Sequence, residues 1–163
     1  MDKITRRIGI DAGHRVTYHH SKCRSLHGHR YEVEATCEGL LSTSGSTQGM
    51  VGGLDFGFLK EEMMEAIDVP CDHALILWNQ DPLVPMLVPG FSDAWGLGLV
   101  QGVEGMKVYL MDAVPTAENL ARHWADLLVP RVENRTQGLA KLSHLRVYET
   151  PNCWADYYPP RGL

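Results

Sequence analysis

The sequence predicts an α+β fold in which an antiparallel sheet carries two helices on one face. Alternating apolar and polar residues near both ends of the chain predict strands, and two amphipathic stretches between them predict helices. The order strand, strand, helix, helix, strand, strand then places both helices on one face of a single sheet. A chain of 163 residues has the length of one domain.

Two alternations predict the first two strands. Over residues 5–14, Ile8, Ile10 and Ala12 alternate with glycine and aspartate. Over residues 27–38 the alternation is stricter, and one face collects His27, His29, Tyr31, Val33, Ala35 and Cys37. The other face is mostly charged, so we expect an antiparallel strand with one buried and one solvated face. Such an open sheet leaves two unpaired edges, which an oligomer would cover.

Two amphipathic segments predict the helices. The first follows a Ser-, Thr- and Gly-rich loop at 41–53 and covers about 56–67, with an apolar side made of Phe56, Leu59, Met63 and Ile67. The second begins after Thr116, whose hydroxyl suits an N-cap, and Pro130 is expected to end it. Its apolar side consists of Leu120, Trp124, Leu127 and Leu128.

The remaining strands are shorter, and an irregular segment precedes them. Residues 106–111, 145–150 and 153–157 show the apolar runs or alternations expected of strands. Prolines and glycines are frequent between residues 79 and 105, so we expect an irregular insertion with a small hairpin near Trp95. We therefore expect one domain over residues 1–163, with this insertion as its least regular part.

Composition and charge argue against several classes of protein. The formal net charge is −5, with 15 Lys and Arg against 20 Asp and Glu, which does not suit a polybasic nucleic-acid-binding protein. No apolar run approaches the roughly 20 residues that span a bilayer, so we expect no membrane partner. The cysteines are far apart without a CxxC pair, and the first residues lack the apolar core of a signal peptide. We therefore expect reduced thiols and a cytoplasmic location.

Three histidines are placed to meet at one point. His27 and His29 lie two apart in a strand, so both side chains leave the same face, about 7 Å apart. His14 is in phase with the apolar residues of the preceding strand, and pairing of the two strands would bring it beside them. Three neutral imidazoles can bind Zn²⁺ and leave a fourth position open, which is typical of a catalytic site. The alternative is unrelated histidines in a core; His19 and His20 suit a loop, although either could replace a ligand.

Cys23 lies four residues before His27 and is flanked by Lys22 and Arg24. Cationic neighbours and a nearby metal favour the thiolate, which is the form that acts as a base or nucleophile. A small residue in a loop is the simpler interpretation of a lone cysteine.

Two carboxylates also suggest chemistry. Asp72 precedes His73, and a carboxylate that orients an imidazole can form a proton-transferring base, although the dipeptide alone is a weak signal. Glu149 shares a strand face with Leu145 and Val147, and a carboxylate on a face that points to the core needs a partner. That partner is either an arginine or a ligand that offers paired N–H donors.

Five segments, in order along the chain, carry a resemblance to a known family. They are IDAGHRV…SKCRSLHGHRYEVEATCEG, GMVGGLDFGFLK, CDHALIL, PTAENLA and LRVYETPNCWADY, and they cover most of residues 10–157. Together they resemble the family of 6-pyruvoyl-tetrahydropterin synthase and 6-carboxy-tetrahydropterin synthase. The resemblance implies the tunnelling fold, a ββααββ unit. It also implies trimers, usually stacked as hexamers, whose sheets close into a barrel with active sites at subunit interfaces.

The resemblance also implies roles for individual residues. The implied zinc ligands are His14, His27 and His29. The implied proton relay, in which Cys23 is the general base, consists of Cys23, Asp72 and His73; in some members this histidine comes from a neighbouring subunit. Glu149 would anchor the pterin by accepting from its 2-amino group and ring N3–H. Glu118 matches a second glutamate near the pterin. Candidates for the triphosphate are Lys22, Arg24 and Arg30, with solvated surface charge as the alternative.

The spacing before the HGH motif distinguishes two branches of the family. Three residues separate Cys23 from His27, which resembles the bacterial 6-carboxy-tetrahydropterin synthases of 7-deazaguanine (queuosine) biosynthesis. The pyruvoyl-forming enzymes have a longer spacing. The resemblance then implies a zinc-dependent lyase that converts 7,8-dihydroneopterin triphosphate to 6-carboxy-tetrahydropterin, acetaldehyde and triphosphate. No glycine-rich stretch opens a helix as a dinucleotide site would, so neither nicotinamide nor flavin is expected.

Other functions are also compatible with these residues, and the sequence departs from the family pattern in two places. The rival functions are a lyase that forms the pyruvoyl product or cleaves dihydroneopterin, a non-catalytic pterin- or purine-binding homologue, and a structural zinc module. GMVGGLDF is longer than the family's GMVxDF. The 79–105 segment is also longer than in compact members, where it could form a lid or a subunit contact.

Overall fold

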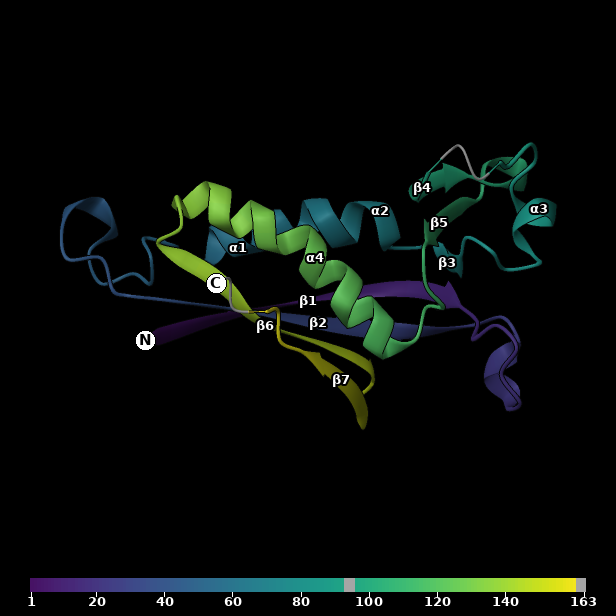
Figure 1. The fold of residues 1–163 in the computed structure, drawn as a ribbon, viewed down its shortest axis with the longest axis horizontal. Coiled ribbons are helices and arrows are strands. Elements are labelled where there is room, and N and C mark those ends of the chain that lie inside the picture. The colour runs from purple at the N-terminus through teal and green to yellow at the C-terminus, as the bar shows by residue number, and fades with distance from the viewer. Residues whose placement is uncertain (93–95, 161–163) are drawn as a thin grey trace.

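The computed structural model describes residues 1–92 and 96–160, which are organised around a seven-stranded sheet (Figure 1). The strand order is β4-β5-β3-β1-β2-β6-β7. The strands are β1 (Asp2–His14), β2 (His27–Gly39), β3 (Leu75–Trp78), β4 (Gly98–Gln101), β5 (Lys107–Met111), β6 (Ala140–Thr150) and β7 (Cys153–Tyr157). Helices α1 (Phe56–Met63), α2 (Val69–Cys71) and α4 (Ala117–Thr136) cover one face of the sheet, and the short α3 (Val84–Leu87) lies at its β4–β5 end. The expected α+β class is confirmed.

A long antiparallel hairpin forms the centre of the sheet. β1 and β2 pair over their whole length, from Asp2 opposite Gly39 to His14 opposite His27. β6 and β7 extend this hairpin in antiparallel fashion, as expected from the sequence. β3 and β5 instead add parallel pairs, and β3 meets β1 only at Gly13 and His14. The long strands are therefore antiparallel, whereas β3 pairs in parallel with both of its neighbours.

The buried face of the sheet follows the alternation in the sequence. Ile10 in β1 and Tyr31 and Val33 in β2 are fully buried, and α4 packs Trp124 and Leu128 against them. Each such side chain stabilises the fold by about 1.5–3 kcal/mol through burial. The outer face is charged and mostly accessible to solvent. Glu38 on this face is buried, and it lies 3.4 Å from Lys141 Nζ and 3.7 Å from Lys3 Nζ.

The first helix begins at Phe56, as expected, but its end and its buried side differ from the expectation. Asp55 caps it, and its carboxylate accepts a 2.7 Å hydrogen bond from the amide of Phe58. Phe56, expected on the apolar side, is 54% exposed, while Phe58 packs against the core instead. The helical path also continues past Ile67 through a π-helical turn (Met64–Asp68) into α2, because Cys71 at its end is buried in the same core.

The expectation that Pro130 ends the second helix is wrong. α4 continues to Thr136, with Pro130 inside it. The ring removes one helical hydrogen bond, but Pro130 and Asp126 lie on the exposed side, where water can bond to the freed carbonyl. Beyond the proline, Val132 and Thr136 are buried, and the Thr136 hydroxyl donates to the Val132 carbonyl at 2.8 Å. Packing of this last turn thus outweighs the local cost of the proline.

The segment expected to be irregular contains regular elements. α3 and β4 lie within residues 79–105, and β4 pairs with β5 in antiparallel fashion. The hairpin expected near Trp95 is centred on residues outside the described ones. β3, which the sequence analysis missed, is a run of four residues whose middle pair, Ile76 and Leu77, is fully buried. Among the described residues, no helix is both long and apolar enough to cross a membrane.

Candidate metal centre and surrounding site

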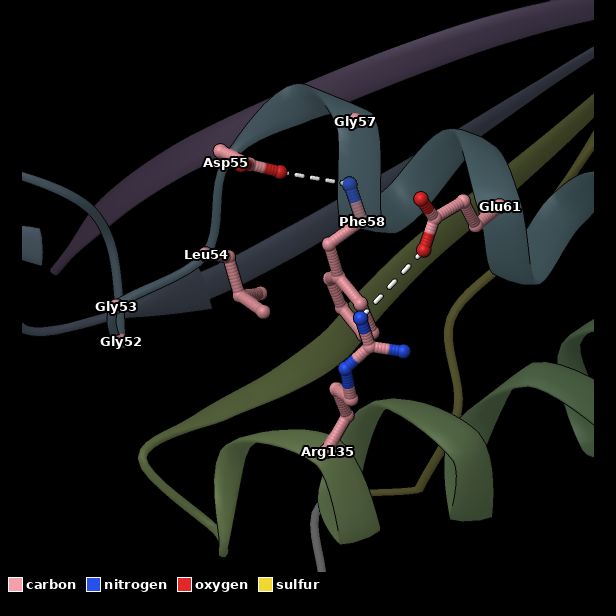
Figure 2. Close-up of a pocket in the computed structure, with 8 residues that line it drawn as sticks. All are labelled: Gly52, Gly53, Leu54, Asp55, Gly57, Phe58, Glu61 and Arg135. Carbon is pink, nitrogen blue, oxygen red and sulfur yellow. Dashed lines mark hydrogen bonds and ion pairs between the residues drawn. The ribbon is translucent and has the colours of Figure 1, made fainter.

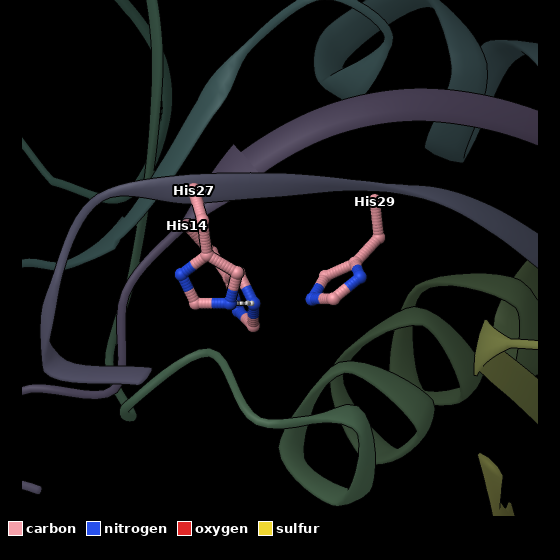
Figure 3. Close-up of side chains that lie close together, drawn as sticks. All are labelled: His14, His27 and His29. Carbon is pink, nitrogen blue, oxygen red and sulfur yellow. Dashed lines mark hydrogen bonds between the residues drawn. The ribbon is translucent and has the colours of Figure 1, made fainter. Parts of the chain in front are cut away.

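Three histidines meet at one end of the central hairpin (Figure 3). His14 is the last residue of β1, and His27 opens β2 directly opposite it. His29 follows two residues later on the same face, as the strand period requires. Their ligand nitrogens all lie within 4.8 Å of one another. The hairpin register and the inward phase of β1 therefore produce the cluster that the sequence predicts.

Backbone carbonyls set the tautomers of two of these rings. His14 Nδ1 lies 2.7 Å from the Pro115 carbonyl, and His27 Nδ1 lies 2.7 Å from the Ser25 carbonyl. A carbonyl can only accept, so each Nδ1 carries a hydrogen and each neutral ring presents the lone pair of its Nε2. The two Nε2 atoms then face each other at 3.1 Å. Two lone pairs at this distance repel unless a cation lies between them.

The donor set fits a metal ion. His29 Nε2 is buried and has no hydrogen-bond partner among the described residues. Burial lowers the pKa of His14 and of His29, against the opposing effect of the Pro115 carbonyl on His14 and of Glu149 on both. Neutral imidazoles with free lone pairs are the form that binds Zn²⁺, and carbonyl-oriented rings are typical of such sites. These three residues can therefore hold a divalent metal and leave one side of it open.

Glu149 and Tyr31 flank the histidines. Glu149 Oε1 lies 3.4 Å from His29 Nε2 without hydrogen-bond geometry, and within the described chain Glu149 forms no ion pair with an arginine. The Tyr31 ring packs edge-on against His14 and His29, with centroids 5.7 and 5.4 Å away. Its hydroxyl is buried without a partner, and burial, followed by the charge of Glu149, raises the pKa of Tyr31 above its usual value. The Glu149 carboxylate thus contacts His29 and can still accept hydrogen bonds from a ligand.

Cys23 lies in the connection between β1 and β2. It is half-buried in a single 3₁₀ turn (Lys22–Arg24), and the Ser21 side chain accepts from its amide at 3.2 Å. The Cys23 carbonyl accepts a 2.8 Å hydrogen bond from the amide of Val16. The loop that carries Cys23 therefore returns to the end of β1, next to the metal-ligand candidate His14.

Asp72 and His73 form a hydrogen-bonded pair at the edge of β1. His73 Nδ1 lies 2.7 Å from Asp72 Oδ2, while Asp72 Oδ1 accepts from the Asp11 amide at 2.9 Å. These hydrogen bonds, that from Asp11 first, hold the pKa of Asp72 below its usual range against burial. The His73 amide donates to the Asp11 carbonyl, and the ring is 77% exposed. No hydrogen bond or ion pair among the described residues joins this pair to the three histidines of the same chain.

Of the other candidates, Glu118 lies on α4, Arg30 on β2 and His19 in the loop between β1 and β2. Glu118 is exposed in the first turn of α4, close in sequence to Pro115, whose carbonyl holds His14. Arg30 lies on the outer face of β2 and pairs with Asp11 at 2.9 Å. His19 accepts a hydrogen bond from the amide of Ser21, so it is a loop histidine as expected.

A separate pocket of about 270 Å³ lies at the start of α1, at the other end of the sheet (Figure 2). It is lined by Gly52, Gly53, Leu54, Asp55, Gly57, Phe58, Glu61 and Arg135. Its charged groups pair with each other or with the backbone: Arg135 Nη2 lies 3.4 Å from Glu61, and Asp55 caps the helix. Arg135 also lies over the Phe58 ring at 4.8 Å. These pairings are structural, so the histidine cluster remains the candidate site.

Several contributors to the site were missed from the sequence. Tyr31 had a usable signal, because it continues the phase of His27 and His29 in β2. Asp11 also alternates visibly, but its role in holding Asp72 depends on a contact across 61 residues. The Pro115 carbonyl meets His14 across 101 residues, and no local pattern encodes that contact.

Comparison with known proteins agrees with this fold and with the family resemblance. The family model described as 6-pyruvoyl tetrahydropterin synthase matches residues 3–160. The 6-carboxy-5,6,7,8-tetrahydropterin synthase of Rickettsia felis is 36% identical over 156 residues, which are 96% of this chain and 99% of that protein. The protein of the same name from Haemophilus influenzae is 29% identical over 157 residues, with the same coverage of 96% and 99%.

Solved structures match over nearly the whole length as well. An uncharacterized protein from Wolinella succinogenes has a TM-score of 0.78 at 27% identity and covers 98% of each chain. The 6-pyruvoyl tetrahydropterin synthase of Caenorhabditis elegans has a TM-score of 0.62 at 21% identity, covers 98% of this chain and 96% of its own, and supports the fold alone. With a family model that matches nearly every residue and relatives above 30% identity along the chain, this protein belongs to the 6-pyruvoyl tetrahydropterin synthase family.

Proposed function

We propose that this chain is a zinc-dependent 6-carboxy-5,6,7,8-tetrahydropterin synthase of 7-deazaguanine biosynthesis. It would convert 7,8-dihydroneopterin triphosphate and water to 6-carboxy-tetrahydropterin, acetaldehyde and triphosphate. Four Rickettsia proteins that bear this name are between 34% and 36% identical over 96% of the chain, which supports this branch. The observation that carries the proposal is the convergence of His14, His27 and His29 next to a carboxylate, Glu149, that has no arginine partner among the described residues.

The three histidines would hold the zinc ion. His14 and His27 are oriented by the carbonyls of Pro115 and Ser25, so their Nε2 atoms are ready to bind without a change of tautomer. When bound, zinc supplies Lewis-acid polarisation of the substrate oxygens that contact it.

Glu149 would bind the pterin ring. Its carboxylate can accept two N–H bonds side by side, and a pterin offers such a pair in its 2-amino group and N3–H. The position suits this role, because Glu149 is half-buried on β6 and lies next to His29. Glu118, exposed at the start of α4, would lie at the rim of the same site.

Two groups would move protons. Cys23 is the proposed base, since its loop joins the two strands that carry the metal ligands. Asp72 and His73 form a relay that binds β1 at Asp11 and leaves the His73 ring exposed. We propose that the exposed His73 ring meets a second subunit, so that the relay serves the site of a neighbour in a trimer or hexamer.

The test is to incubate the zinc-loaded protein with 7,8-dihydroneopterin triphosphate and to measure pterins, triphosphate and acetaldehyde together. Stoichiometric acetaldehyde and 6-carboxy-tetrahydropterin are expected. A Cys23→Ala variant should lose turnover, whereas the matched Cys153→Ala variant at an exposed position of β7 should keep it. Triphosphate release without acetaldehyde would instead indicate the pyruvoyl-forming reaction. Tight pterin binding without turnover would indicate a binding protein.

A further inference from the structure

Asp81 is a buried carboxylate to which the proposed function assigns no role. It follows β3 at the start of the insertion, and it is 1% exposed. Both of its oxygens are fully used. Oδ1 accepts from Arg15 Nη2 at 2.7 Å and from the Leu83 amide at 2.8 Å. Oδ2 accepts from Arg15 Nε at 2.8 Å and from the Thr17 hydroxyl.

These hydrogen bonds reach the loop that carries Cys23. Arg15 and Thr17 are the first part of that loop, immediately after His14. The Val16 amide between them donates to the Cys23 carbonyl at 2.8 Å, and Arg15 Nη1 lies 3.4 Å from the Arg24 carbonyl. The carbonyls of Cys23 and Arg24 are therefore held by residues 15–17, a segment that Asp81 binds through the Arg15 and Thr17 side chains.

Burial of the Asp81 carboxylate is energetically costly, which indicates that its hydrogen bonds are specific. A buried carboxylate loses its hydration, and that loss is offset only if its partners have good geometry. Here the guanidinium binds in the bidentate mode, and a hydroxyl and an amide fill the remaining positions. The loop itself has only a single turn of 3₁₀ helix, so strand pairing does not hold it between His14 and His27.

We propose that Asp81 is a positioning residue, which sets the place of the Cys23 thiol through Arg15 and Thr17. The proposal rests on the proposed function in one respect, since Cys23 matters to turnover only if it is the base. A base displaced by about 1 Å can lose up to roughly a hundredfold in rate, so small movements of this loop matter. The insertion would then support the site from outside it.

The test compares Asp81→Asn with Glu62→Gln as a matched control. Glu62 is also a mostly buried carboxylate and accepts from Arg131 at 2.9 Å and Arg135 at 3.4 Å, but on the helical side of the fold, away from the loop. Each variant is loaded with zinc, and kcat, KM and bound zinc are measured. In parallel, alkylation by iodoacetamide is followed at Cys23 by peptide mass spectrometry, with the exposed Cys153 as internal reference.

Opposite changes in the two rates are expected for Asp81→Asn. The half-buried Cys23 thiol should alkylate several-fold faster because the loop is released, while kcat falls by about tenfold or more with KM and zinc content unchanged. A double variant with Asp81→Asn and Arg15→Gln should lose no more kcat than either single variant, because both changes break the same hydrogen-bond network. Glu62→Gln should change neither rate.

Three results would overturn the proposal: an unchanged alkylation rate at Cys23, a changed rate with unchanged kcat, or the same effects from Glu62→Gln. If the unmodified protein does not turn over the pterin triphosphate, the proposed function fails and the link to catalysis falls with it. The alkylation rates still decide whether Asp81 holds the loop, because that measurement needs no substrate.

Discussion

Replacement of Glu149 by glutamine should weaken pterin binding and leave the metal centre intact. The carboxylate lies 3.4 Å from His29, is 26% exposed and forms no ion pair with an arginine of the described chain. A glutamine has nearly the same shape, so the contact with His29 is preserved. What changes is the hydrogen bonding that a bound pterin would find.

The size of the effect follows from the groups involved. A carboxylate accepts from both pterin N–H groups, whereas an amide accepts from one and presents its own N–H to the other. Loss of a hydrogen bond to a charged group costs about 1.5–3 kcal/mol. Because Glu149 is partly exposed to solvent, we expect the lower part of this range, about 1.5–2 kcal/mol, which corresponds to a roughly 10- to 30-fold rise in Kd.

The assay is a fluorescence titration of the zinc-loaded protein with neopterin, an oxidised pterin that cannot react. Zinc content is measured in the same samples and should not fall, because Glu149 raises the pKa of His29 and its replacement leaves that ring neutral. Glu62→Gln serves as the control, since it removes a carboxylate of similar burial from the helical face. A Kd within twofold of the unmodified protein would refute the assignment of Glu149 as the pterin anchor.

Four further predictions follow from the same structure. His29→Ala should drop bound zinc well below one per chain in atomic emission after desalting, with unchanged far-ultraviolet circular dichroism because the core does not depend on the metal. Asp81→Asn should lower the free energy of unfolding in urea by about 3 kcal/mol at pH 7, and by less below about pH 4. Pro130→Ala should raise that free energy by about 1 kcal/mol, because it restores a helical hydrogen bond on an exposed face. Mixed and reassembled His73→Ala and Cys23→Ala subunits should recover activity that neither variant has alone.

The pH dependence of the Asp81 variant has a definite sign. Burial raises the pKa of this carboxyl, but the hydrogen bonds from Arg15, Thr17 and the Leu83 amide outweigh burial and hold it below its usual range. A group whose pKa is lowered on folding contributes stability above its unfolded pKa of about 3.9, and loses it as the pH falls through the folded value. If the difference in the free energy of unfolding between the unmodified protein and Asp81→Asn grows on acidification, this account is contradicted.

For each of the other predictions, one experimental result would contradict the reasoning. Full zinc occupancy in His29→Ala would mean that the cluster is not the metal site. A less stable Pro130→Ala protein would mean that proline stabilises this helix by restricting the unfolded chain. Complementation that fails, although the mixed subunits assemble, would place the whole relay within one chain.

The sequence predicted those parts of the fold and site that depend on local periodicity. The two-residue period of β2 placed His27 and His29 on the buried face, and the phase of β1 placed His14 beside them. It also identified Thr116 as the cap of α4, whose hydroxyl accepts from the Asn119 amide at 3.3 Å. These features are settled by a few neighbouring residues, so a single sequence is enough to find them.

What could not be predicted depends on contacts between distant segments. Pro130 was expected to end α4, because its local cost is known from sequence and the gain from burying Val132 is not. β3 has only four residues, which is too short a run to distinguish a buried strand from a helix. Asp81 gave no signal at all, because its partners precede it by 66 and 64 residues.

These contacts hold the three parts of the site to different degrees. The three histidines lie near the ends of two strands that pair over 13 residues each, so surface changes elsewhere should barely move them. The Asp72–His73 pair is fixed to Asp11 by two backbone contacts and to β5 by Lys107, whose Nζ donates to the Asp72 carbonyl at 2.7 Å. The Cys23 loop is outside the strand pairing, and besides its own backbone hydrogen bonds it is held by the buried Asp81 through Arg15 and Thr17. Substitution of Asp81 in the insertion should therefore impair the proposed proton transfer well before it impairs metal binding, because its side chain binds Arg15 and Thr17 of the loop, whereas strand pairing holds the histidines.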